Sequence, residues 1–126
     1  MIQLFTELQE KKNVRSNLSA LRASLKEATE EQKAQAIEFV RGHEDLVFGF
    51  LQEEDAKTRK NAALLLGDLA VQNALQPLWK AYTREQTLFV KSAYLEAMKA
   101  LHAEEILSQL KDRLAELELS LIHISE

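Results

Sequence analysis

A residue pattern that recurs 31 positions apart constrains this chain more than any other feature. In the first copy, residues 53–69, an acidic turn leads into a helix with an arginine, an Ala-Ala pair, a run of leucines and a late glycine. A related pattern returns in residues 86–101. Recurrence at such a spacing is typical of stacked helix pairs, because each pair buries its apolar face against the next. We therefore expect a protein that presents a surface rather than a catalytic centre.

The composition also favours helices. The 126 residues include only three glycines and one proline, which leaves little material for turns. Ala, Leu, Glu, Lys and Gln are abundant and favour helix, while the β-branched residues do not alternate as they would in strands. We predict an all-α fold, a right-handed α–α superhelix of about three to four helix pairs.

Apolar residues at helical spacing, together with capping residues, place the expected helices. Thr29 and Gln32 form a capping box, and Asp55 can cap the helix that follows it. The expected helices cover residues 2–12, 14–27, 29–42, 43–51, 55–70, 73–82, 87–101 and 102–117.

The last of these helices carries an unfinished repeat. Three of its leucines match three apolar residues of an earlier helix at a spacing of 32, namely Leu107, Leu110 and Leu114 with Leu75, Leu78 and Tyr82. We expect it to be the first helix of a fourth unit without its second helix, which would leave an apolar stripe uncovered.

The domain organisation expected from these patterns is a single helical-repeat domain over residues 1–118, followed by a tail over residues 119–126. The tail is apolar and β-prone, and it resembles the translated read-through of a sequencing adapter. We treat it as either foreign to the protein or a truncated end, and expect the chain to be the N-terminal part of a longer protein.

Several classes of function are disfavoured by the composition. A formal net charge of −4 argues against nonspecific nucleic-acid binding over the whole surface. Cysteine is absent, and His43, His102 and His123 are too far apart to predict a metal site. The N-terminus carries charge too early for a signal peptide, and no apolar run is long enough to cross a membrane. We expect a cytoplasmic protein without metal, cofactor or membrane partner.

The aromatic residues of the third helix pair could serve either packing or recognition. They are Trp79, Tyr82, Phe89 and Tyr94. We expect Trp79 and Phe89 in the core, because their spacing suits mutual packing of the two helices. For Tyr82 and Tyr94 both readings stay open.

The first copy of the recurring pattern resembles the HEAT-repeat family, in particular its bacterial lyase-type repeats. The family's second helix follows Asp-x-x-Val-Arg-x-x-Ala-Ala-x-x-Leu-Gly-x-Leu. The matching residues here are Asp55, Arg59, Ala62, Ala63, Leu66, Gly67 and Leu69, with Thr58 in place of the valine. The resemblance is clearest over residues 43–101 and looser in the second copy, where Tyr94 replaces the second alanine and Met98 the glycine. It implies structural roles for the matching positions, with the aspartate and arginine linking neighbouring repeats.

In such arrays the second helices line a concave face, which is the expected binding surface. The residues predicted to project there are Lys57, Lys60, Asn61, Lys91, Ser92 and Tyr94, with Lys99 at the rim. The equivalence of Lys60 with Lys91 at 31 residues predicts a polar-basic stripe. The alternative is that these are ordinary solvated helix faces.

Three functions are compatible with these features. The first is a scaffold that binds a protein or peptide along the concave face. The second is an RNA-positioning appendage of a larger bacterial RNA methyltransferase, because residues 60–68 and 85–96 are similar to helical repeats that precede such domains. The third is a HEAT-type lyase or a glycosylase-like enzyme. We expect no catalysis in this chain, because its serines lack a nucleophile elbow and its paired acids suit helix starts.

Overall fold

The computed structural model describes the backbone of residues 2–124, with side chains described up to His102 and at a few later positions. Every regular element in this part of the chain is helical, which confirms the all-α prediction. The elements are α1 (Ile2–Gln9), α2 (Val14–Lys26), α3 (Glu30–Gly42), α4 (Glu44–Phe50), α5 (Ala56–Asp68), the 3-10 turn η1 (Gln72–Ala74), α6 (Leu75–Arg84) and α7 (Leu88–Ile124).

The helix starts follow from local side-chain chemistry. Thr29 and Gln32 form the predicted capping box at α3, each side chain bonded to the other's backbone N–H at 3.1 Å. At α5 the carboxylate of Asp55 accepts the backbone N–H of Thr58 at 3.0 Å and its hydroxyl at 2.8 Å. Both caps satisfy donors that have no partner inside the helix.

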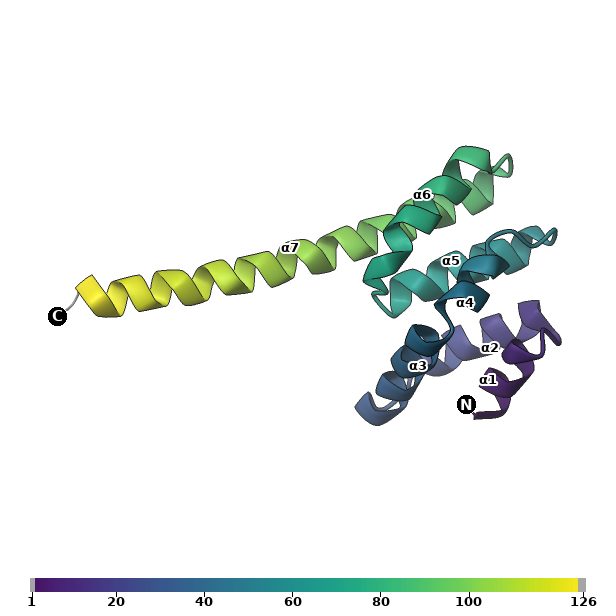
Figure 1. Cartoon of the computed structure of the whole chain (residues 1–126), viewed down its shortest axis with the longest axis horizontal. Helices are drawn as coiled ribbons and strands as arrows, with labels where there is room; N and C mark the ends of the chain where they lie inside the picture. Colours follow the sequence, from purple (N-terminus) through teal and green to yellow (C-terminus); the bar gives the residue numbers. More distant parts are fainter. Residues whose placement is uncertain (1, 125–126) are drawn as a thin grey trace.

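Three helices form a row through the centre of the molecule (Figure 1). Helix α2 packs against α5, and α5 packs against α7. On these lie α1 against α2, α4 against α5 and α6 against α7. Because α5 touches both neighbours in the row, its buried residues form the middle of the core.

The core of α5 depends on small and aliphatic side chains. Ala62, Ala63, Leu65 and Leu66 are each at most 1% exposed. Gly67 faces α7 so closely that an added Cβ would lie 2.9 Å from the Cα of Ala97. The backbones of α5 and α7 therefore approach at a point where a larger residue has no room.

The burial pattern of α5 returns in α7 at a spacing of 32 residues, not the 31 that the sequence pattern predicts. Five buried positions of α5 match buried positions of α7, namely Thr58 with Val90, Asn61 with Ala93, Ala62 with Tyr94, Leu65 with Ala97 and Leu69 with Leu101. At a spacing of 31 residues, three of these buried positions would match exposed positions of α7, namely Thr58, Asn61 and Leu65. The difference of one residue rotates α7 by about 100° relative to the expected alignment.

Helix α7 contradicts the expected break at His102. It runs without interruption over 37 residues, and its second half extends beyond the other helices (Figure 1). The backbone of the expected β-prone tail is helical as far as Ile124. The leucines predicted to start a fourth unit lie among side chains outside the described ones.

Two aromatic residues expected in the core are instead on the surface. Trp79 is 55% exposed and Phe89 is 48% exposed. Both belong to the helix pair at the end of the row, where no further helix among the described residues covers them. Their exposure therefore results from their position at the end of the row, which the sequences of their own helices do not reveal.

A stack of rings attaches α1 to α3. Phe5 lies on Phe39 with ring centroids 4.4 Å apart, and Phe39 lies on His43 at 4.6 Å. The side-chain amide of Gln9 on α1 also contacts a ring nitrogen of His43. His43 is therefore a packing residue rather than the solvated turn residue that the sequence indicates.

Candidate functional site

One face of α5 stays accessible while the rest of the helix is covered. Its residues are Lys57, Lys60, Leu64 and Asp68, at steps of three and four residues. At a spacing of 32 their counterparts on α7 are Phe89, Ser92, Glu96 and Ala100, which are also exposed or half-buried. We call these eight residues the α5–α7 face.

The six residues predicted for the binding surface do not stay together. Lys57 and Ser92 are exposed and Lys60 is half-buried, all on the α5–α7 face. Asn61 is only 9% exposed, and Tyr94 is fully buried. Of the residues predicted to project from this face, Lys57, Lys60 and Ser92 are accessible, whereas Asn61 and Tyr94 are buried and do not project from it.

Lys91 points away from that face. Its ammonium lies 5.3 Å from the centre of the Tyr82 ring on α6, a cation–π contact. In the register of 32 residues Lys60 corresponds to Ser92, while Lys91 corresponds to Arg59. The predicted stripe joining Lys60 to Lys91 is consequently absent.

The row of helices carries most of the basic charge around this face. Helix α2 has three basic and no acidic residues, and α5 has three basic and one acidic residue. Helices α3 and α4, by contrast, have five acidic and two basic residues. This separation makes the side of the molecule formed by α2 and α5 the more positive one.

Ion pairs across the row use some of these charges. Arg15 of α2 reaches Asp55 at 3.4 Å, and Arg22 reaches Asp68 at 2.8 Å. Lys26, Lys57 and Lys60 have no carboxylate within 4.0 Å among the described residues. Their charges are therefore available to a ligand.

A cavity of about 380 Å³ lies at one end of the α5–α7 face. It is lined by Arg22, Leu25, Lys26, Lys33, Ile37, Asp68, Leu69 and Ala70. Asp68 belongs both to this cavity and to the accessible face of α5, so the two are continuous. Arg22 is paired with Asp68 within this lining, so Lys26 and Lys33 beside the apolar residues are the groups suited to an anion with an apolar neighbour.

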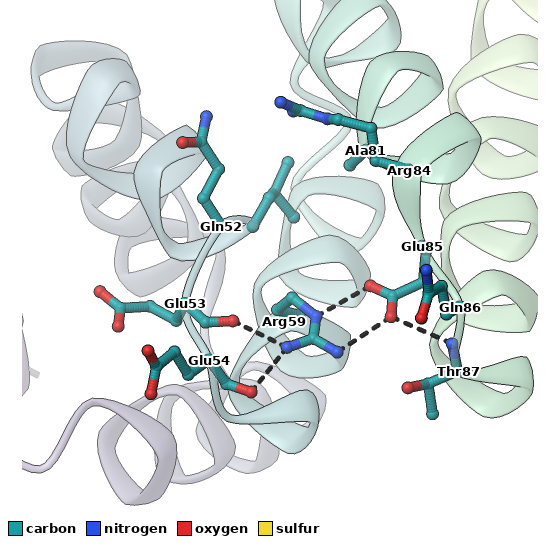
Figure 2. A pocket seen from close by; sticks show the side chains of 10 residues that line it. Gln52, Glu53, Glu54, Arg59, Ala81, Arg84, Glu85, Gln86 and Thr87 are labelled. Carbon is teal, nitrogen blue, oxygen red and sulfur yellow. Dashed lines mark hydrogen bonds and ion pairs between the residues drawn. The ribbon is translucent and has the colours of Figure 1, made fainter.

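A second cavity, of about 440 Å³, lies between the loops that join α4 to α5 and α6 to α7 (Figure 2). Arg59 stands at its base with its guanidinium fully engaged. It donates to both carboxylate oxygens of Glu85 at 2.8 and 2.9 Å, and to the carbonyl oxygens of Glu53 and Glu54 at 2.8 and 2.7 Å. Arg59 therefore serves to hold the two loops together.

Glu85 is the acceptor at the centre of this cluster. Besides Arg59 it accepts the backbone N–H of Thr87 at 3.2 Å and the hydroxyl of Tyr94 at 3.0 Å. Burial alone would raise the pKa of Glu85, but the hydrogen bonds from these three residues outweigh it and hold the pKa below its ordinary value. The carboxylate is thus ionised and saturated, which suits a structural role and not proton transfer.

Tyr94 completes the cluster from α7. Burial and its hydrogen bond to Glu85 raise the pKa of Tyr94 well above that of a free tyrosine. Tyr94 is thus a core residue and not the surface residue predicted, and it matches a fully buried alanine of α5 at a spacing of either 31 or 32, Ala63 or Ala62. The tyrosine is larger than the alanine, and its hydroxyl is satisfied because it donates to the carboxylate of Glu85.

The positions implied to be structural by the HEAT resemblance are all in helix contacts. Ala62, Ala63 and Leu66 are buried, and Gly67 lies against α7. Asp55 pairs with α2 and Arg59 with the loop before α7, so each links neighbouring helix pairs. The partner of Arg59 is Glu85, which carries no sequence signal that distinguishes it from the other acidic residues.

The described part of the chain offers neither a metal site nor a membrane-spanning helix. Among the described side chains no three His, Cys, Asp or Glu residues converge as metal ligands would. None of the described helices has an apolar stretch sufficient to cross a bilayer. The basic cavity next to Asp68 is the one feature of the site that sequence reasoning missed, since it joins residues from three helices.

Comparison of the chain with protein-family models, with curated proteins and with solved structures found no match.

Proposed function

We propose that this chain is a HEAT-type helical-repeat module that binds an acidic, extended segment of a protein partner. In this proposal the pairs ending in α2, α5 and α7 are successive units of a right-handed superhelix. The cytoplasmic setting expected from the sequence is part of the same proposal. The observation that carries it is the α5 half of the α5–α7 face, where Lys57, Lys60 and Leu64 lead toward the cavity beside Asp68.

The repeat assignment is supported by the way the helices pack. The helices α2, α5 and α7 contact one another in chain order, and each carries a partner helix. The burial pattern recurs from α5 to α7, as it does when equivalent helices occupy equivalent places. Arg15 with Asp55 and Arg59 with Glu85 join neighbouring pairs.

The chemistry of the partner follows from the groups on the face. Lys57 and Lys60 lie one turn apart and attract carboxylates, while Leu64 and Phe89 offer apolar contact. From Lys57 to Asp68 the face runs for roughly 17 Å along α5. Lys26 and Lys33, which line the cavity at the end of this track, can then receive an acidic side chain, while Arg22 stays paired with Asp68.

A phage-displayed library of random peptides tests the proposal. We expect selection on the whole chain to enrich peptides rich in Asp and Glu around an apolar residue. The double variant Lys57→Glu/Lys60→Glu should bind an enriched peptide about tenfold more weakly or worse, because two attractive charges become repulsive. Fluorescence anisotropy with the labelled peptide measures this change.

A control is Lys80→Glu, which makes the charge change of one of these two substitutions on α6, away from the face. It should bind as the unmodified chain does. Enrichment of neutral peptides, or equal binding by the double variant, would contradict the proposed site.

The RNA-positioning function is a second candidate, favoured by the lysines that have no carboxylate partner within the described chain. Phosphates could occupy Lys26, Lys57 and Lys60 in place of carboxylates. In that case a single-stranded oligouridine should bind with an affinity that falls with salt, by a logarithmic slope of about 0.7 per neutralised phosphate. Tight peptide binding without oligouridine binding at low salt would decide for the protein partner.

A further inference from the structure

A second surface, on the other side of α6, is apolar and aromatic. Trp79 and Tyr82 stack with ring centroids 5.7 Å apart, and Lys91 of α7 lies over Tyr82. Leu75 precedes Trp79 by four residues and is 44% exposed, and Leu95 follows Lys91 by four and is 49% exposed. We call Leu75, Trp79, Tyr82, Lys91 and Leu95 the outer patch.

The outer patch faces away from the rest of the row. The opposite side of α6, with Pro77, Lys80 and Ala81, lines a cleft with Phe48 and Leu51 at the end of α4. Leu75, Trp79 and Tyr82 follow one another at steps of four and three residues, which places them on the other side of α6. The patch is thus the terminal face of the last helix pair, and apolar faces of this kind are typical of interfaces.

We propose that the outer patch is the interface of a homodimer, covered by residues 103–118 of a second copy of this chain. The first argument is charge. Helix α6 has no acidic residue, and Lys91 and Lys99 lie on the adjoining part of α7. Residues 103–118 carry five acidic and two basic residues, with leucines and an isoleucine at helical spacing.

The second argument is the continuity of α7. Because the helix continues past His102, its second half leads away from the outer patch of its own copy (Figure 1). Two such helices packed antiparallel, with the twofold axis near His102, bring each second half to the outer patch of the other copy. The contact is then made twice by the same residues, as in a closed twofold dimer.

The third argument is the register that this symmetry imposes. Opposite residues in such a pair have numbers that add to about 204 or 205. Leu95 then meets Leu110, Leu88 meets Leu117, and Lys99 meets Glu105. The two leucine pairs fit a sum of 205 and the Lys99–Glu105 pair a sum of 204, so apolar residues face apolar ones and a base faces an acid within one residue of a single register.

Sedimentation equilibrium of the whole chain over a range of concentrations is the first measurement. We expect a reversible dimer. Trp79 is the single tryptophan and is 55% exposed, so its fluorescence should shift to the blue and become less accessible to acrylamide as the dimer forms. Leu95→Lys should raise the dissociation constant by tenfold or more, since it places a charge opposite Leu110 in an apolar contact.

A charge exchange tests the register. Lys99 and Glu105 are both exposed, so substitutions there leave the core intact. Lys99→Glu and Glu105→Lys should each weaken the dimer, and the double variant should recover most of the loss. Lys26→Glu, on α2, is the control and should leave the dimer unchanged.

Three results would overturn the proposal. The first is a monomer at every concentration with Trp79 accessible to acrylamide. The second is protection of Trp79 in a monomer, which would mean that the segment covers its own copy. The third is a dimer that neither Leu95→Lys nor the charge exchange affects. None of these bears on peptide binding at the α5–α7 face, so the two proposals fail separately.

Discussion

At the scale of single residues, Gly67 lies in surroundings very different from those of the other two glycines. Gly67 lies against Ala97, and an added Cβ would be 2.9 Å from a backbone atom of α7. Around Gly49 on α4 an added Cβ would meet nothing within 4 Å. The same substitution is therefore expected to have opposite effects at the two positions.

Gly49→Ala should raise the free energy of unfolding by about 0.5–1 kcal/mol, because alanine restricts the unfolded chain and favours helix. Gly67→Ala gains the same propensity but forces α5 and α7 apart, so it should lower the free energy of unfolding by about 1–3 kcal/mol. Urea denaturation followed by circular dichroism measures both. A stabilised Gly67→Ala variant would show that the helices do not approach there.

The buried hydroxyl of Tyr94 predicts how stability depends on alkaline pH. Its pKa is raised in the folded state above the ordinary value of 10.0, so the phenol ionises more readily in the unfolded chain. The stabilisation is complete below the ordinary pKa and is lost as the pH rises above it. Tyr94→Phe should therefore be less sensitive to alkali, while losing about 1.5–3 kcal/mol at neutral pH with the hydrogen bond to Glu85.

Ultraviolet absorbance of tyrosinate checks this, because the chain has only two tyrosines. Tyr82 lies at the surface under Lys91 and serves as the internal comparison. Ionisation of both tyrosines before the helices unfold would contradict the assignment of Tyr94 to the core.

At the scale of helices, α5 depends on Asp55 both for its cap and for its link to α2. Asp55→Ala removes the acceptor of two Thr58 hydrogen bonds and the partner of Arg15. We expect a loss of about 0.5–2 kcal/mol, the usual cost of an N-cap. Asp55→Asn retains the capping oxygen and should recover most of it, which separates the cap from the exposed ion pair. Thermal unfolding of the two variants makes the comparison.

How much of each helix the sequence predicts depends on whether its signals are local. The caps at Thr29 and Asp55 involve residues within one turn, and both are predicted correctly. The break at His102 is wrong because no glycine or proline interrupts the helix there, and the repeat pattern alone implied it. Trp79 and Phe89 are wrong for a different reason, since their burial depends on a neighbouring helix that the sequence of α6 and α7 does not contain.

In the candidate site, too, residues with local signals are predicted correctly and residues whose positions depend on neighbouring helices are not. Lys57 and Lys60 are predicted at the surface because they alternate with the apolar residues of α5. Asn61 and Tyr94 are misplaced because their burial depends on contacts between helices, Asn61 on the packing around α5 and Tyr94 on its contact with Glu85 before α7. The basic cavity joins Arg22, Lys26 and Lys33, whose proximity depends on how α2 and α3 pack.

At the scale of the whole molecule, α5 is the helix on which the others depend. It contacts α2 on one side and α7 on the other. Ala62→Asp would bury a charge without a partner at this centre and should unfold the protein as a whole. Leu66→Ala should lower the free energy of unfolding by about 2–5 kcal/mol in a single transition, because the site is fully buried.

The comparison for that prediction is Leu8→Ala, since Leu8 is equally buried but lies on α1 at the edge of the row. Hydrogen exchange should show the loss at Leu8 confined mainly to α1 and α2, and the loss at Leu66 in every helix. Normal melting of Ala62→Asp would contradict the inward orientation of α5.

The uninterrupted course of α7 has a mechanical consequence. The rod beyond Leu101 is about 33 Å long at 1.5 Å per residue, so turning the last helix pair by ten degrees would swing its tip by roughly 6 Å. A small change in the orientation of α6 and the start of α7 therefore produces a much larger displacement at the far end of α7.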